Sequence, residues 1–249
     1  MMKRLHLRTF NLFTLGLLII LPCSAEQSAA PDIPLYECNF THESIQIDGL
    51  LDEPAWSRAP AADLILWDGS GPASLRTVAR MLWDQKYLYI SYRVEDPQCT
   101  CTLIERDTDI HTEEVVEFFV DSSGDGIDYQ EFEWNCLGNC LDLLLVKQED
   151  GSRHFFFGWD VREMQWKVHQ GEINMEGERV QGWQCEIAIP FTAIHEKSKE
   201  APTVGDIWRI NHYRIERKST GVEYQAWSPV PGTEVGFHRP ELFGKLIFK

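Results

Sequence analysis

Hydrophobic and polar residues alternate along much of the chain, and the pattern is clearest at residues 75–95. Within this segment, residues 77–82 and 87–94 are rich in aromatic and β-branched side chains, and residues 83–86 separate the two runs. Such side chains fit the pleated, half-buried surface of a strand. We therefore predict a β-hairpin here, with its turn at 83–86.

Similar runs recur to the end of the chain without long helices between them. Two short helical turns are predicted, one beginning near Pro54 and one at 190–194. Strands that follow one another in this way favour an antiparallel, all-β sandwich of the immunoglobulin-like or jelly-roll-like kind. The further strands that we expect lie at 114–121, 129–136, 141–147, 154–159, 163–170, 179–189, 206–216 and 243–248.

The first 25 residues have the pattern of a secretory signal peptide. A basic start precedes an apolar stretch at 10–21 that is short for a membrane span, and small residues lead to a cleavage position after Ala25. We expect an exported protein, whether periplasmic, secreted or on the cell surface, with a leader segment at 26–43 and one domain at 44–249. The alternative is a lipoprotein anchored through Cys23. No later segment is long and apolar enough to be a transmembrane helix.

The charge and the cysteines narrow the classes of partner. The formal net charge is −16, which repels nucleic acid and anionic lipid but not neutral sugars or divalent cations. Six cysteines remain once Cys23 is set aside, and an even number in an exported protein favours disulfides. The sequence leaves their pairing open. These six residues are Cys38, Cys99, Cys101, Cys136, Cys140 and Cys185.

Several stretches, in order and at characteristic spacing, resemble the family 9 carbohydrate-binding modules over about residues 44–248. The resemblance implies a β-sandwich that binds mono- or oligosaccharides, often beside glycoside hydrolases and often with structural calcium. The stretches are 47–56 (IDGLLDEPAW), 82–90 (LWDQKYLYI), 111–121 (HTEEVVEFFVD), 129–135 (YQEFEWN), 182–190 (GWQCEIAIP), 227–229 (WSP) and 238–244 (HRPELFG).

The resemblance also points to a sugar site. In sugar-binding members two aromatic residues sandwich the sugar while a carboxylate and an arginine hold its hydroxyls. The matching positions are His111 and Phe237 for the aromatic residues, Glu117 for the carboxylate and Glu133 in place of the arginine. Glutamate cannot act as the obligate donor that arginine is.

Three more residues are candidates to line this groove: Asn135, Trp227 and His238. Alternation places Glu117 on the strand face opposite Val116, which leaves it free to line a polar groove. The alternatives are an ion pair of Glu117 with Arg80 or Arg93, a turn-capping role for His111 and a core position for Phe237.

The segment 121–128 is an acidic loop between two predicted strands. Oxygen-bearing side chains and a following glycine match the first half of a calcium-binding loop, although Phe132 then stands where a bidentate glutamate belongs. An acidic hairpin turn is the alternative. The candidate calcium ligands are Asp121, Ser123, Asp125 and Asp128.

We therefore expect non-catalytic carbohydrate binding in polysaccharide breakdown or uptake. No catalytic constellation stands out among the many acidic residues, so we predict no enzyme activity for the chain by itself. One alternative is an exported protein-interaction domain that has lost sugar binding. Another is a haem-binding electron-transfer module with Met81, Met164 or His212 as axial ligands.

Overall fold

The computed structural model describes residues 33–194 and 201–249. The predicted signal peptide and Cys23 lie outside the described residues. Within the described part, no helix is long and apolar enough to cross a bilayer. The chain folds as an all-β sandwich with two short α-helices, α1 (Pro54–Arg58) and α2 (Phe191–Ile194), which confirms the predicted fold class.

The strands cover most of the regions that alternation predicts. Two short 3-10 helices, η1 (Ile110–Thr112) and η2 (Pro240–Leu242), lie in the connections. The strands are β1 (Leu35–Phe40), β2 (Ala62–Asp63), β3 (Ile65–Leu66), β4 (Thr77–Trp83), β5 (Tyr87–Glu95), β6 (Val115–Asp121), β7 (Asp128–Asn135), β8 (Cys140–Lys147), β9 (Arg153–Phe156), β10 (Gln165–Met175), β11 (Glu178–Pro190), β12 (Ile207–Lys218), β13 (Gly221–Ala226) and β14 (Gly244–Phe248).

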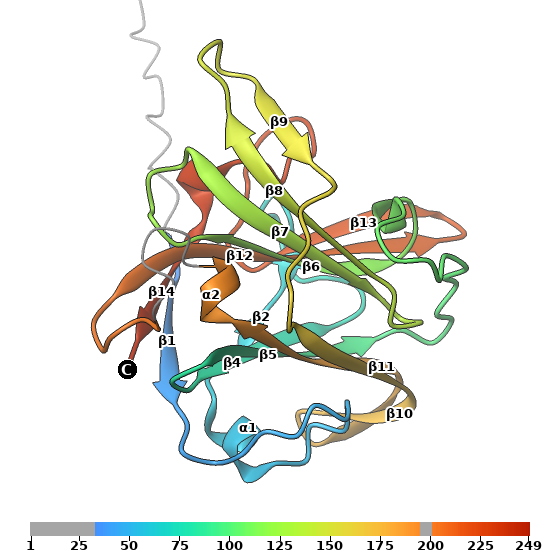
Figure 1. The fold of residues 1–249 in the computed structure, drawn as a ribbon. Helices are drawn as coiled ribbons and strands as arrows, with labels where there is room; N and C mark the ends of the chain where they lie inside the picture. Colours follow the sequence, from blue (N-terminus) through green and yellow to red (C-terminus); the bar gives the residue numbers. More distant parts are fainter. Residues whose placement is uncertain (1–32, 195–200) are drawn as a thin grey trace, which may run out of the picture. The chain divides into compact units, whose positions relative to one another are not determined.

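Two layers of strands face each other (Figure 1). The first, which we call the site sheet, has the order β14-β12-β6-β7-β8-β9, with β13 also paired to β12. The second, the back sheet, has the order β10-β11-β5-β4. Strand β1 joins them, because residues 35–38 pair with β14 while Asn39 and Phe40 pair with β4. Both of these pairings are parallel, whereas the other strand pairs are antiparallel.

The sandwich core fills the space between the sheets. Alternate residues of β6, such as Val116 and Phe118, pack there with Ile90 and Tyr92 of β5. The opposite face of the site sheet carries a second buried cluster, which includes Phe119. Residues of the segment between β13 and β14 pack on this face as well. Because both faces of β6 are covered, all of its residues are buried, and the candidate site lies on the second face.

The hairpin at 75–95 is confirmed as β4 and β5. The Asp84 carboxylate accepts the amides of Lys86 and Tyr87 and so closes the turn. The described part of the expected leader contains β1, which is part of the sandwich. Strand β13 is absent from the sequence prediction. It is short, so the alternation within it is a weak signal. Its place in the sheet is set by its pairing with β12 and β3.

The cysteines form one disulfide among the described residues, between Cys99 and Cys136. The other four are free thiols. Cys38, Cys140 and Cys185 are buried within the sandwich core. The expectation of disulfides is thus met for one pair, and apolar packing accounts for these three thiols.

Candidate functional site

A pocket of about 490 Å³ lies on the outer face of the site sheet. Its floor comes from β6, β7 and β8, and its walls come from β9, η1 and the segment between β13 and β14. The lining residues are His111, Glu117, Phe119, Glu131, Glu133, Leu141, Leu143, Phe155, Phe157, Ile215, Tyr224, Val235, Gly236, Phe237 and His238.

Three glutamates on two neighbouring strands form the polar part of the pocket. Glu117 of β6 stands directly opposite Glu133 of β7 in the antiparallel register. Glu131 lies two residues from Glu133 and therefore on the same face of β7. Their exposures are 2, 2 and 6% for Glu117, Glu133 and Glu131. One oxygen, Oε2, of each carboxyl group is buried without a hydrogen-bond partner. Such orphaned oxygens are rare in folded proteins and are typical of functional sites.

Burial dominates the electrostatics of these glutamates. It raises the pKa of Glu117 well above its usual range, and the charge of Glu133 adds to the effect. The pKa of Glu131 rises for the same reasons, with contributions from Glu133 and Glu117. Burial likewise raises the pKa of Glu133 to about 8. Burial therefore favours the protonated form of all three groups, and Glu133 is largely protonated at neutral pH in the ligand-free protein.

Aromatic rings surround the carboxyl groups. Phe237 stacks on Tyr213 with ring centroids 4.0 Å apart and an interplanar angle of 9°. The Tyr213 hydroxyl donates to the carbonyl oxygen of Phe237 at 3.0 Å, which fixes the backbone there. Phe155 and Phe157 lie nearly parallel at 6.2 Å, and Phe157 is 49% exposed. The pocket thus offers flat apolar faces beside buried acids.

His238 links the aromatic and acidic parts. Its ring lies 5.4 Å from Phe119 and 5.2 Å from Phe155, centroid to centroid. The Tyr129 hydroxyl lies 3.0 Å from its Nδ1. Burial lowers the pKa of His238 to about 4, so the imidazole is neutral at physiological pH. Its Nδ1 is 3.9 Å from Glu131, too far for a hydrogen bond.

Five of the seven sugar-site candidates meet in this pocket: His111, Glu117, Glu133, Phe237 and His238. The other two lie outside it, because each is bonded or packed elsewhere. Asn135 donates to the carbonyl of Leu103 and accepts backbone amides of the turn that follows β7. Trp227 packs against the sandwich core, and its ring lies directly against the backbone of Gly244.

The proposed ion pairs of Glu117 are not formed. Arg80 and Arg93 belong to the back sheet, and both pair with Glu176 instead. Glu117 points to the opposite side of the site sheet and has no arginine or lysine partner within the described ranges 33–194 and 201–249.

Sequence reasoning missed several lining residues, above all Glu131, Phe155, Phe157 and Tyr224. Glu131 carries a signal, because its spacing of two from Glu133 places both on one strand face. Phe155 and Phe157 alternate in the same way. Nothing local assigns Tyr224, because it reaches the pocket through the pairing of β13 with β12.

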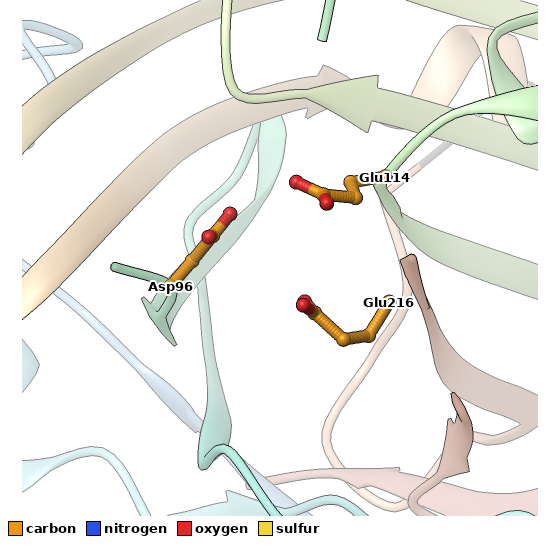
Figure 2. A group of neighbouring side chains, drawn as sticks. All are labelled: Asp96, Glu114 and Glu216. Atoms are coloured by element: carbon orange, nitrogen blue, oxygen red, sulfur yellow. The ribbon is translucent and has the colours of Figure 1, made fainter. Parts of the chain in front are cut away.

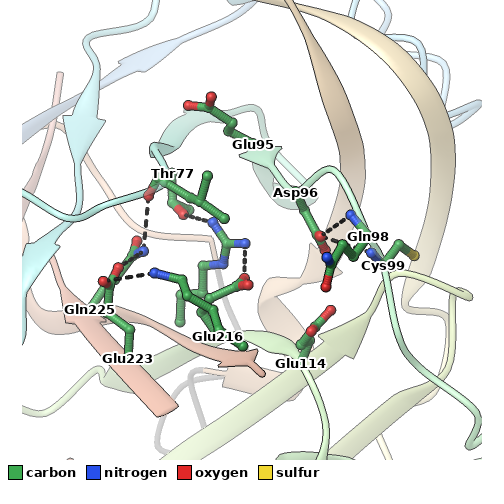
Figure 3. A network of polar contacts seen from close by, with 12 residues as sticks. Thr77, Glu95, Asp96, Gln98, Cys99, Glu114, Glu216, Glu223 and Gln225 are labelled. Carbon is green, nitrogen blue, oxygen red and sulfur yellow. Dashed lines mark hydrogen bonds and ion pairs between the residues drawn. The ribbon is translucent and has the colours of Figure 1, made fainter. Parts of the chain in front are cut away.

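A separate cluster of three acidic residues is a candidate to hold a cation. We call Asp96, Glu114 and Glu216 the acidic cluster; they are 3, 2 and 4% exposed, and each offers an oxygen within 4.8 Å of the others (Figure 2). Arg214 compensates part of this charge through its ion pair with Glu216. Figure 3 shows Asp96, Glu114 and Glu216 within a wider network of polar contacts. Burial raises the pKa of both Glu114 and Glu216. Clustered hard oxygen ligands of this kind suit calcium.

The loop at 121–128 is bonded to itself. Asp121 accepts the amides of Ser123, Gly124 and Gly126, and Asp125 accepts the amide of Ile127. Gly124 and Gly126 have φ near +70°, the left-handed region that a tight turn requires. These bonds are typical of an acidic turn between two strands, and calcium binding by this loop stays a prediction.

The haem-ligand candidates are core residues. Met81 and His212 are fully buried between the sheets, and Met164 packs at the edge of the same core. The His212 Nδ1 lies 2.7 Å from the Tyr92 hydroxyl, and burial lowers the pKa of the imidazole to about 3. Their packing leaves no open face for a macrocycle.

The sequence profile of carbohydrate-binding family 9 matches residues 46–248. The chain belongs to this family. A search of curated proteins found no match. The family 9 fold explains why the predicted groove residues converge, since β6 and β7 bring Glu117 and Glu133 side by side.

Solved structures share the family 9 fold. A protein from Bacteroides uniformis described as carbohydrate-binding is 20% identical, with a TM-score of 0.67, and the match covers 88% of this chain and 100% of that one. A family 9 module from Caldicellulosiruptor kristjanssonii in complex with cellotriose is 16% identical, with a TM-score of 0.58 over 86% and 93% of the two chains. A family 9 module from the same organism in complex with glucose is 16% identical, with a TM-score of 0.55 over 86% and 95% of the two chains.

Proposed function

We propose that the protein binds a mono- or oligosaccharide, without catalysis, in the pocket on the outer face of the site sheet. The observation that carries the proposal is the meeting of His111, Glu117, Glu133 and Phe237 in one cavity. The family 9 structures with glucose and cellotriose support the ligand class. A cavity of about 490 Å³ is within the range of small-molecule sites.

The chemistry of the pocket suits a pyranose ring. The apolar C–H faces of a sugar pack on aromatic rings, here those of Phe237, Phe155 and Phe157. The sugar's polar groups meet the orphaned oxygens of Glu117 and Glu133, which accept or donate according to their protonation. A sugar that completes these bonds recovers the desolvation cost of the buried oxygens.

The experiment is calorimetric titration of the folded protein with a panel of mono- and oligosaccharides. Phe157→Ala removes an exposed ring from the pocket, whereas Phe156→Ala, its matched control, removes a neighbouring ring that is 43% exposed and outside the lining. We expect the first variant to weaken binding roughly tenfold, from the loss of one ring contact. Phe156→Ala should bind like the wild type.

A second variant tests the acids directly. Glu117→Gln keeps the shape of the side chain and should reduce affinity while the protein stays folded. No heat from any sugar at millimolar concentration would overturn sugar binding. That outcome would favour a protein-interaction domain on the same fold.

We further propose that the acidic cluster holds the structural calcium that the family resemblance implies. Bound calcium would neutralise carboxylates that Arg214 alone leaves uncompensated. It supplies no chemistry to the sugar pocket and acts only by tying β5, β6 and β12 together through one ligand near the end of each strand.

We also propose that the protein is exported and acts beside glycoside hydrolases in polysaccharide breakdown or uptake. The Cys99–Cys136 disulfide supports an oxidising compartment. N-terminal analysis of the protein from its native host should give Glu26 as the first residue. A first residue of Met1 would contradict export by cleavage, and a lipid-modified Cys23 would identify a lipoprotein.

A further inference from the structure

The acidic groups of the proposed sugar pocket have no cationic side chain beside them in the described part of the chain. Glu117, Glu131 and Glu133 are buried together, and within residues 33–194 and 201–249 none pairs with a lysine or an arginine. Two arginines lie close to residues of the pocket, but both are engaged elsewhere. Arg217 donates to the carbonyls of His111 and Glu113. Arg153 lies over the ring of Tyr129 and donates to backbone carbonyls of the neighbouring hairpin turn.

No cationic donor among the described residues therefore compensates these acids. A divalent metal is not favoured there, since the described acidic groups whose ligand atoms all lie within 4.8 Å of one another are at other places in the fold. The aromatic walls favour a larger ligand with an apolar face. Such walls also attract a cation through their ring faces.

We propose that the pocket recognises an amino sugar, whose free ammonium group lies between Glu117 and Glu133. This inference rests on the proposed sugar binding and names its ligand class. The ammonium group offers three donors to the orphaned Oε2 atoms of Glu117 and Glu133, which stand side by side on the neighbouring strands β6 and β7. Charge-assisted hydrogen bonds of this type are about twice as strong as neutral ones. The sugar ring packs on Phe237 and Phe155.

The same geometry discriminates against two related sugars. A neutral hexose places a hydroxyl where the ammonium would lie, so it forms only neutral or singly charged bonds with the acids. An N-acetylated sugar has no cationic group and brings a bulky amide to the position beside the neighbouring side chains of Glu117 and Glu133. Binding should therefore fall when the amine is absent or acetylated.

The complex also predicts a proton change. In the free protein Glu133 is protonated at neutral pH, because burial raises its pKa to about 8. An ammonium ion stabilises the carboxylate, so binding releases the carboxyl proton to solvent while the amine keeps its own. Affinity for the amino sugar should rise between about pH 5 and pH 8. The other titratable groups around this position are Asp109, Glu117, Glu131, His111, His238, Tyr213 and Tyr224.

The test is calorimetric titration with glucosamine, glucose, N-acetylglucosamine and cyclohexylamine, in two buffers of different ionisation enthalpy. We expect glucosamine to bind roughly tenfold or more tightly than glucose, with proton release. In Glu133→Gln the affinity for glucosamine should fall further than the affinity for glucose, so the preference should disappear. Glu172→Gln, which changes an exposed glutamate of β10, is the matched control and should behave like the wild type.

The titration results separate the amino-sugar assignment from the proposed sugar binding. Equal affinity for glucose and glucosamine would overturn the amino-sugar assignment and leave sugar binding intact. Cyclohexylamine binding as tightly as glucosamine would overturn it too, because the pocket would then recognise an amine rather than a sugar. Failure of all three sugars to bind would refute the proposed function itself, and the inference with it.

Discussion

The buried acids make a prediction about the ligand-free protein. Replacing Glu133 with glutamine removes a titratable group whose pKa is raised to about 8 in the folded state, from 4.5. Below pH 4.5 this carboxyl group is protonated in both the folded and the unfolded state, so it costs no stability. As pH rises from 4.5 to about 8 the unfolded state ionises first, and the free energy of unfolding falls. The wild type should therefore lose stability across this window, and Glu133→Gln should lose less.

The magnitude follows from the two pKa values. One pKa unit corresponds to about 1.4 kcal/mol, so the ionisable Glu133 costs on the order of 4 kcal/mol at about pH 8 but about 1 kcal/mol at about pH 5. The difference, about 3 kcal/mol, is the stabilisation that the variant should gain over the wild type between the two pH values. Glu133 also raises the pKa of Glu117 and of Glu131, so the variant lowers both of these pKa values, which adds to its gain in stability at the higher pH.

The assay is urea unfolding followed by tryptophan fluorescence at both pH values, with the disulfide kept oxidised. Glu172→Gln is the control, because that carboxylate is exposed and paired with Arg179 at the surface. A stability difference between Glu133→Gln and wild type that stays constant with pH would refute the reasoning. It would mean that Glu133 is solvated in solution and that its burial does not control its protonation.

Other predictions concern the frame around the pocket. Reducing Cys99–Cys136, which spans 37 positions, should lower the free energy of unfolding by about 4 kcal/mol in urea titrations; an unchanged midpoint would contradict this. Gly244→Ala places a Cβ 2.1 Å from the Trp227 ring and should destabilise by on the order of 2 kcal/mol in the same assay; a neutral result would show that Trp227 moves freely. Removal of calcium by a chelator should lower the melting temperature of the wild type. The loss in free energy of unfolding should be about 3 kcal/mol if calcium had been present at a hundredfold its Kd. A variant in which one carboxylate of the acidic cluster is replaced by its amide, such as Glu114→Gln, should keep the same melting temperature when the chelator is added.

Much of the fold could be read from local pattern. The hairpin of β4 and β5 has strong alternation and a turn closed by Asp84, so its signal is contained in about twenty residues. Strand β1 was missed because its register depends on β14 and β4, which lie far away in the chain. The segment 44–48 alternates but forms no strand, since Ile45 and Ile47 instead pack in the cluster around Trp56.

The site divides in the same way. Alternation alone places Glu117 on the face opposite Val116, and the family resemblance picks out Glu133, His111 and Phe237. The resemblance does not exclude Asn135, whose hydrogen bonds in the turn after β7 become visible only in the folded chain.

The sequence by itself determined the strand pattern, the fold class and the composition of each strand face, because side-chain direction along a strand has a period of two. The tertiary structure decided which faces meet. Pairing of β6 with β7 sets Glu117 against Glu133, and the segment before β14 encloses them with Phe237. Burial, and with it the raised pKa values of the pocket acids and their lack of a cationic partner, arises from contacts between residues distant in sequence. It is therefore a property that local pattern cannot contain.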